Sequence, residues 1–203
     1  MTKLREQRRE ARFFAIGASL FAIGAVFAAF PAINATFTGL TFFIGSIFFT
    51  TASLIQWLLS GRPRFAGWGG AEAIDWWSAA IQFAGTLFFN VSTFAAILNL
   101  SILGERQHVW RPDVFGSAAF LISSLLAVWA CRDRDRLWDP AARLWKVTWL
   151  NLFGSVAFGV SAVAARISPE SGLVANASLE GLGTFFGALG FLFAALLMAP
   201  QRA

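Results

Sequence analysis

The sequence predicts an all-α integral membrane protein with six transmembrane helices, arranged as three parallel helical-hairpin repeats of about 70 residues. Three observations predict it: the composition, the segregation of charge and a recurring motif. Of the 203 residues, 57% are hydrophobic and 13% are charged, and the mean hydropathy is +0.64. A soluble domain usually carries about 25% charged residues. This chain therefore has too little polar surface to cover itself in water.

Most charged residues cluster in five short segments, 1–12, 62–75, 104–113, 131–146 and 166–170. The apolar runs between them are long enough to cross a bilayer, which takes about 20 helical residues. The six predicted helices cover residues 13–30, 36–59, 75–103, 113–130, 146–166 and 174–199. We therefore expect a basic cytoplasmic tail over 1–12 and a single membrane domain over 13–203, with hairpin repeats 13–60, 74–131 and 140–200.

The first apolar run follows a basic segment, as the apolar part of a cleaved signal peptide would. It is about 18 residues long, however, which exceeds the usual length of such a region. It also carries the motif that recurs in the other predicted helices. We therefore expect this run to remain as a membrane anchor.

The motif reads Gly, small residue, two spacers, Phe, two spacers and two small residues. It occurs once in each predicted helix, and the six copies begin at Gly17, Gly45, Gly85, Gly116, Gly154 and Gly187. Copies in alternate helices lie about 70 residues apart, which makes the repeating unit a two-helix hairpin. Each hairpin starts and ends on the same side of the membrane, so the repeats are parallel.

Helix packing gives a physical reason for the motif. Residues at i, i+4 and i+7 share one face of a helix. Gly and other small residues on that face let a second backbone approach closely, and van der Waals contact then drives association in lipid. The six Gly residues are therefore predicted to be helix-packing positions, with Phe filling the adjacent groove. A ligand-lining role for the same faces is the less favoured alternative.

The second predicted helix contains the sequence FIGSIFF over residues 43–49. A hairpin with this sequence in its second helix resembles the YrhK-like domain, a small bacterial two-helix membrane module. The resemblance implies three tandem copies over most of the chain and an integral membrane protein. The resemblance implies no particular activity and no catalytic residues. The third copy departs most from the pattern, because Gly183, Gly187 and Gly190 replace a single Gly-Ser.

Lys and Arg are unevenly divided between the two sides of this predicted topology. Thirteen lie on the side of the two termini, and three lie on the other side, namely Arg106, Arg111 and Arg166. Because cytoplasmic loops carry an excess of basic residues, we expect a multi-pass protein of the cell membrane with both termini in the cytoplasm. The basic residues are expected to contact anionic lipids on that face, and no nucleic-acid-binding patch is present.

Glu180 is the first candidate for a functional residue. It lies about seven residues into the last predicted helix, about 10 Å along it. Ionisable groups at such depth are costly and tend to mark ion or proton pathways. The alternative, which we favour from sequence, is a structural carboxylate paired with Arg166.

Amide side chains form the second candidate group, and they could line a polar path. More often such amides bond across helices, at about 0.6 kcal/mol on average, so a structural role is favoured. With Glu180 and Arg166, the candidate intramembrane polar site comprises Gln82, Asn90, Asn99 and Asn151.

Two function classes fit these observations. The preferred one is a non-catalytic scaffold or accessory subunit that contacts a membrane-protein partner or a second copy of itself. The alternative is a small transporter or channel that uses Glu180 and the intramembrane Asn residues. A dry, filled centre favours the first, and a continuous polar cavity favours the second. No nucleophile, phosphate loop or metal-ligand spacing stands out, so no enzymatic activity, metal or cofactor is expected.

Overall fold

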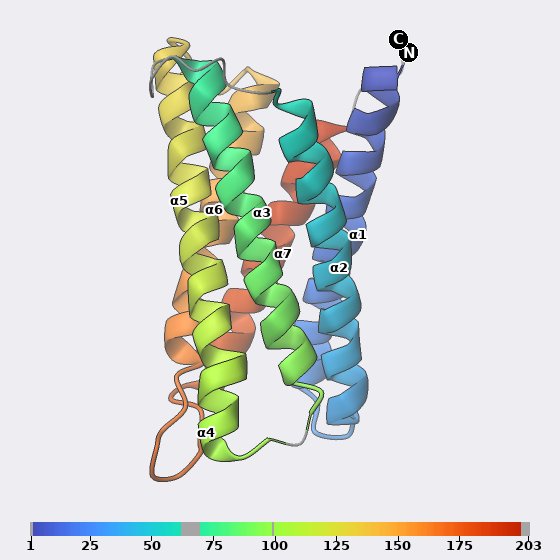
Figure 1. Cartoon of the computed structure of the whole chain (residues 1–203), viewed down its shortest axis with the longest axis vertical. Helices are drawn as coiled ribbons and strands as arrows, with labels where there is room; N and C mark the ends of the chain where they lie inside the picture. Colours follow the sequence, from blue (N-terminus) through green and yellow to red (C-terminus); the bar gives the residue numbers. More distant parts are fainter. Residues whose placement is uncertain (1, 62–69, 99, 200–203) are drawn as a thin grey trace.

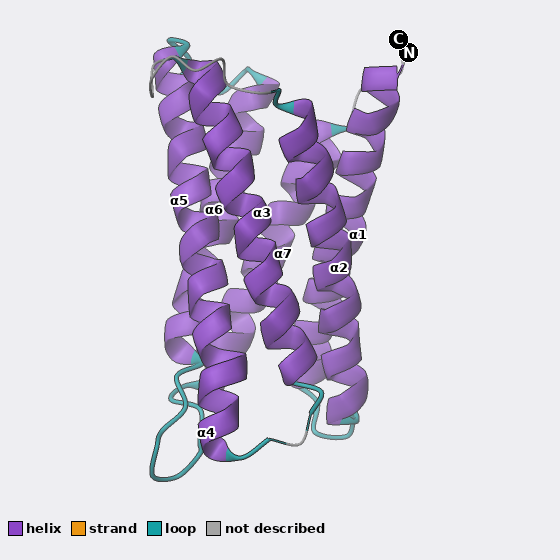
Figure 2. Ribbon diagram, in the orientation of Figure 1, coloured by secondary structure: helices purple, strands orange, loops and turns teal. Residues whose placement is uncertain are grey.

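The computed structural model describes residues 2–61, 70–98 and 100–199 and is a bundle of six long helices (Figure 1). These are α1 (Thr2–Ala28), α2 (Ala35–Leu59), α3 (Ala71–Ala95), α5 (Arg111–Asp133), α6 (Arg143–Ala164) and α7 (Ala177–Met198). A short helix α4 (Ile102–Glu105) continues through a π-helical turn, Arg106–Trp110, into α5. The described part of the chain contains no β-strand (Figure 2), and its one antiparallel bridge pairs Ile167 with Val174.

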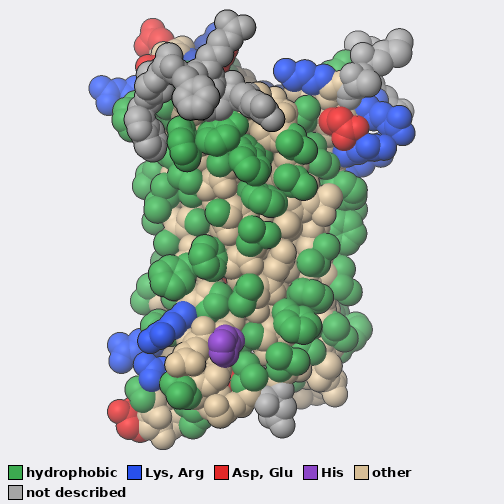
Figure 3. Space-filling model, in the orientation of Figure 1, with side chains coloured by type: hydrophobic (Ala, Val, Ile, Leu, Met, Phe, Trp, Pro, Cys, Tyr) green, Lys and Arg blue, Asp and Glu red, His purple; other side chains and the backbone are tan. Residues whose placement is uncertain are grey.

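Five of the described helices, all except α3 among the long ones, are long and apolar enough to cross a membrane. The prediction of an all-helical protein with transmembrane helices is thus confirmed at this level. Helix α3 is equally long, but Gln82 and Asn90 lower its hydropathy. Hydrophobic side chains cover the middle of the face in Figure 3, and charged side chains lie towards its two ends.

The helices form a closed ring, in which α1 packs against α2, α2 against α3, α3 against α5, α5 against α6, α6 against α7, and α7 against α1. Helix α1 begins and α7 ends at the same end of the bundle (Figure 1), here called the terminal end. The other end is called the opposite end.

Two predicted boundaries, the start of α1 and the end of α3, differ most from the structure. Helix α1 begins at Thr2, because the basic segment continues the helix and Glu6 pairs with Arg9 one turn later. Helix α3 ends at Ala95 rather than near residue 103. The chain becomes helical again at Ile102, where the hydroxyl of Ser101 accepts a hydrogen bond from the Gly104 N–H and caps α4.

The motif glycines meet in pairs within the ring. Gly17 faces Gly45, Gly85 faces Gly116, and Gly154 faces Gly187. A Cβ added to the first glycine of each pair would lie 3.0, 3.2 and 2.9 Å, respectively, from the carbonyl oxygen of the second. The backbones of α1 and α2, α3 and α5, and α6 and α7 are therefore in direct contact, and no other residue fits these positions without a shift.

Hydroxyl groups connect one glycine-paired helix pair to the next pair in the ring. Ser46 contacts Thr93 at 3.0 Å and Ser53 contacts Thr86 at 3.3 Å between α2 and α3. Between α5 and α6, Ser124 contacts Ser155 at 2.7 Å. The α7–α1 contact instead uses small apolar residues, with Ala18 and Ala188 fully buried. Two kinds of small residue therefore achieve the same close approach.

Candidate functional site

Six phenylalanines fill the centre of the bundle, and they are the motif phenylalanines of the six long helices. All are buried, with at most 5% of each residue exposed: Phe21, Phe49, Phe89, Phe120, Phe158 and Phe191. We call this set the phenylalanine plug.

The plug consists of two stacked triangles. Phe21, Phe89 and Phe158 have ring centroids 5.8–6.4 Å apart, and the other three rings have centroids 5.5–6.2 Å apart. Contacts of 5.2–5.4 Å within each glycine-paired helix pair join the two triangles. From sequence, these rings were expected to fill grooves between helices. Their common position in all six copies was the signal that a closed ring would bring them together.

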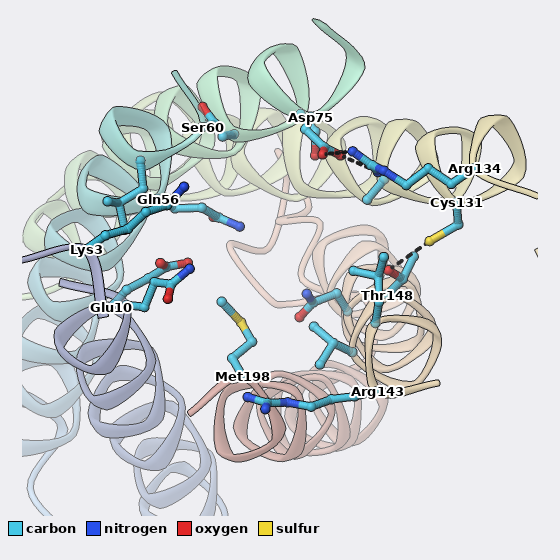
Figure 4. Close-up of a pocket in the computed structure, with 18 residues that line it drawn as sticks. Lys3, Glu10, Gln56, Ser60, Asp75, Cys131, Arg134, Arg143, Thr148 and Met198 are labelled. Atoms are coloured by element: carbon cyan, nitrogen blue, oxygen red, sulfur yellow. Dashed lines mark hydrogen bonds and ion pairs between the residues drawn. The ribbon is translucent and has the colours of Figure 1, made fainter. Parts of the chain in front are cut away.

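A cavity of about 510 Å³ opens at the terminal end, here called the terminal vestibule. Glu10 of α1 lines it and is only 5% exposed (Figure 4). Its carboxylate has no hydrogen-bond or ion-pair partner among the described side chains. A carboxylate in the interior of a helical bundle is costly unless it is solvated or paired. Water or a cation in the vestibule could provide this for Glu10.

The rim of this vestibule is held by charged groups. Arg134 forms a two-pronged ion pair with Asp75 (Figure 4), which raises the pKa of the guanidinium above its ordinary value. Arg143 donates hydrogen bonds to the backbone carbonyls of Leu197 and Ala199 and so caps α7. Two of the basic side chains that line the terminal vestibule are thus already engaged.

A small chamber of about 10 Å³ lies between the terminal vestibule and the plug. Gln56, Gln82 and Asn151 line it, together with Phe191 of the plug. The Oε1 atom of Gln56 is buried without a hydrogen-bond partner, whereas Oε1 of Gln82 accepts a hydrogen bond of 3.3 Å from Ser123. Gln56 and Asn151 also line the terminal vestibule, so the two spaces adjoin.

A second large cavity, about 330 Å³, lies at the opposite end and is here called the opposite vestibule. Phe21 and Phe89 form part of its wall, and three carboxylates line it, those of Glu105, Asp113 and Glu180. No hydrogen bond or ion pair to these three carboxylates occurs within the described part of the chain. The lining contains no Lys or Arg among the described residues, so this vestibule is acidic.

Hydroxyl groups in the opposite vestibule already have partners. Ser161 donates to the backbone carbonyl of Glu180 and contacts the Thr184 hydroxyl, both at 2.8 Å. Ser92 donates to the carbonyl of Val109 at 2.8 Å. These bonds fix the backbones around the carboxylates and leave the carboxylates themselves facing the cavity.

The structure separates the predicted site residues into different places. Gln82 and Asn151 meet in the small chamber, and Glu180 lies in the opposite vestibule. Asn90 accepts a hydrogen bond from Thr50 and borders an apolar groove elsewhere. Asn99 lies outside the described residues.

The expected pairing of Glu180 with Arg166 is absent, although both residues are described. Arg166 instead acts on Glu170 in the 165–176 connection, where a hydrogen bond from Ser168 is the main cause that lowers the pKa of Glu170. The positive charge of Arg166 therefore lies outside the vestibule that holds Glu180.

Sequence reasoning missed Glu10 and Asp113. Both had been assigned to charged segments outside the membrane. Glu10 precedes the motif glycine Gly17 by seven residues, and Asp113 precedes Gly116 by three. Those offsets place them on the packing face of their helices, and that register was the available signal.

The described residues contain no group of three or more His, Cys, Asp or Glu side chains that could hold a metal ion. The resemblance to the YrhK-like domain stays a prediction. No family model, no curated protein and no solved structure matches the chain.

Proposed function

We propose that the chain is a multi-pass cell-membrane protein in which all six long helices cross the bilayer as three parallel hairpin repeats. The three glycine pairs support this arrangement, because equivalent residues make equivalent contacts in each hairpin. The 25 residues of α3 span about 37 Å at 1.5 Å per residue, enough to cross the hydrocarbon core. The excess of basic residues on the side of the two termini supports a cytoplasmic location for the terminal end.

Within this frame we propose a non-enzymatic transporter or channel for protons or small cations, closed at the phenylalanine plug. The observation that carries the proposal is the set of unpartnered carboxylates on both sides of the plug: Glu10 at one end, and Asp113 and Glu180 at the other. Ionisable groups inside membrane bundles usually mark ion or proton routes, and hydrophobic constrictions gate such routes by excluding water.

A non-catalytic scaffold is the second candidate, and the plug itself favours it, because the rings fill the centre between the two vestibules. A scaffold has no need of carboxylates that face internal cavities, since apolar residues would pack there at lower cost. For this reason the transport proposal explains more of the molecule than the scaffold does.

The N-terminal part of α1 supports contact with anionic lipids. Arg5, Arg8, Arg9 and Arg12 are exposed, and Arg9 and Arg12 lie on the same helical face as Ile16 and Ile23, which are 41% and 43% exposed. These arginines therefore project outward, above the lipid-facing side of the helix, where phosphate headgroups are found.

A flux measurement in proteoliposomes tests the transport proposal. Phe89→Ala removes a plug ring, whereas Phe88→Ala removes a neighbouring ring that is 42% exposed and faces away from the bundle. With a potassium diffusion potential and an internal pH dye, we expect Phe89→Ala to raise proton or cation flux at least tenfold over wild type, and Phe88→Ala to leave it unchanged.

A nonspecific leak is distinguished by adding Asp113→Asn to Phe89→Ala. Flux through the proposed route should fall when the carboxylate is neutralised, while a leak through a damaged bundle should not. Flux equal to that of protein-free liposomes for wild type, Phe89→Ala and Phe88→Ala alike would favour the scaffold.

A further inference from the structure

The small chamber beneath the plug has an unusual lining for a membrane bundle. Three amide side chains reach it, and each comes from a different glycine-paired helix pair: Gln56 from α2, Gln82 from α3 and Asn151 from α6. Its volume of about 10 Å³ is close to the minimum for one water molecule or one small ion.

The positions of the amides follow the repeat but break its symmetry. Gln82 and Asn151 each precede a motif glycine by three residues, where the first hairpin has Phe14. Gln56 follows Gly45 by eleven residues, where the other hairpins have Ala127 and Met198. The first hairpin thus supplies its amide from its second helix. The rest of the lining is apolar, and Phe14 and Met198 are part of it.

The polar groups here are not all used within the protein. Oε1 of Gln56 is buried without a partner. The carboxylate of Glu10 faces the adjoining vestibule, and it has no hydrogen-bond or ion-pair partner among the described side chains. A buried amide oxygen and a buried carboxylate each lose free energy unless something donates to them or binds them. Both groups, the Gln56 amide oxygen and the Glu10 carboxylate, can be satisfied by a hydrogen-bond donor or by a cation.

We propose that this chamber binds one partly dehydrated monovalent cation, of the Na⁺ or K⁺ class. Amide oxygens from Gln56, Gln82 and Asn151 would replace part of its water shell, and Glu10 would supply the compensating charge from the vestibule. Neutral oxygens with one carboxylate suit a monovalent ion, whereas Ca²⁺ sites use six to eight oxygens that include several carboxylates. The inference rests on the proposed function, since it names what occupies the route on the terminal side of the plug.

Thermal unfolding of the purified full chain in detergent tests the binding directly. We compare NaCl, KCl and N-methyl-D-glucamine chloride at the same ionic strength, because the large organic cation does not fit the chamber. At a cation concentration well above Kd, NaCl or KCl should raise the Tm of wild type by about 5 °C relative to the organic cation.

Matched carboxylate variants locate the site. Glu10→Gln keeps the shape and hydrogen bonding of the side chain and should remove most of the cation-dependent shift, as should Gln56→Leu. Glu180→Gln, on the far side of the plug, should retain the full shift. If Gln56→Leu does not fold, Glu10→Gln and Glu180→Gln still decide the question.

The outcomes separate this inference from the transport proposal. Equal Tm values for wild type in all three salts mean that the chamber holds only water, and overturn the inference. An equal loss of the shift in Glu10→Gln and Glu180→Gln overturns the location. A retained shift without any cation flux through Phe89→Ala supports the site and overturns the transport proposal alone.

Discussion

The two vestibules are built by the same ring of helices, yet they differ in charge. The opposite vestibule has three carboxylates and no basic residue in its described lining. The terminal vestibule mixes Glu10 and Asp75 with Lys3, Arg134 and Arg143, and adjoins a chamber of amides. The opposite vestibule is therefore lined by negative charge alone among the described residues, whereas the terminal vestibule carries both signs of charge and adjoins a chamber of uncharged amides.

The phenylalanine plug lies between these two differently charged cavities. The six buried rings fill the centre of the bundle, and the cavities on their two sides differ in the charge of their linings. In a medium of low dielectric, charges in one space act strongly on an ion in that space. Under the proposed function, a cation would concentrate in the acidic vestibule and lose part of its water only at the amide chamber.

The largest effect is expected from Gly154→Leu, at the contact between α6 and α7, two helices that contribute residues to both vestibules. A Cβ at this position would lie 2.9 Å from the carbonyl oxygen of Gly187, so α6 and α7 would be forced apart. Overpacking of this kind costs about 1–3 kcal/mol or more. Detergent stability by fluorescence-detected size exclusion should drop sharply.

Gly159→Leu is the matched control on the same helix, since a Cβ there meets nothing within 4 Å. Its stability should remain close to that of wild type. Equal losses in the two variants would show that the contact between α6 and α7 is not the cause.

A second prediction tests the charge difference between the vestibules by neutralising two carboxylates of the opposite one. In the Phe89→Ala background, the joint replacement of Asp113→Asn and Glu180→Gln should lower cation flux by at least tenfold, about 1.4 kcal/mol. The cause is the loss of negative charge from a vestibule without basic residues in its described lining.

Glu10→Gln in the same background should reduce flux less when cations enter from the opposite side, because Lys3 already offsets charge in the terminal vestibule. Comparing the two entry directions in oriented proteoliposomes checks this. A larger loss from Glu10→Gln in both directions would contradict the assignment of the acidic side as the entry funnel.

A third, smaller effect concerns the rim of the terminal vestibule. Asp75→Asn removes the charge that pairs with Arg134, and both side chains are partly exposed, at 42% and 31%. Solvent screening therefore limits the loss of unfolding free energy to about 0.2–1 kcal/mol. Chemical unfolding should show a small shift, with the opposite vestibule and its flux unaffected.

The smallest predicted effect concerns a hydrogen bond across the contact between α5 and α6. The hydroxyl of Ser117 is buried without a partner. By the repeat, Ser117 corresponds to Ser46, and Ala162 corresponds to Thr93, which pairs with Ser46. Ala162→Ser should supply the missing partner and stabilise the protein by about 0.6 kcal/mol; Ala165→Ser serves as the control. An unchanged unfolding midpoint would mean that the two hydroxyls do not meet.

Prediction from sequence succeeded for features that a single helix carries by itself. Apolar length identified five of the long helices as membrane-spanning candidates, and the register of small residues indicated which face packs, as the glycine pairs illustrate. It was least successful for side chains whose role depends on distant neighbours. Glu180 was expected beside Arg166, whereas it shares a cavity with Asp113 and Glu105.

The sequence by itself determined that the chain is helical and apolar and that each long helix has one face of small residues with a central Phe, because these properties depend only on local composition and a period of 3.6 residues. The tertiary structure alone decided that the six rings meet on a common axis and that carboxylates and amides collect on its two sides. The physical reason is closure of the ring. Only when α7 packs against α1 do six separate packing faces acquire a shared interior, with a distinct space at each end.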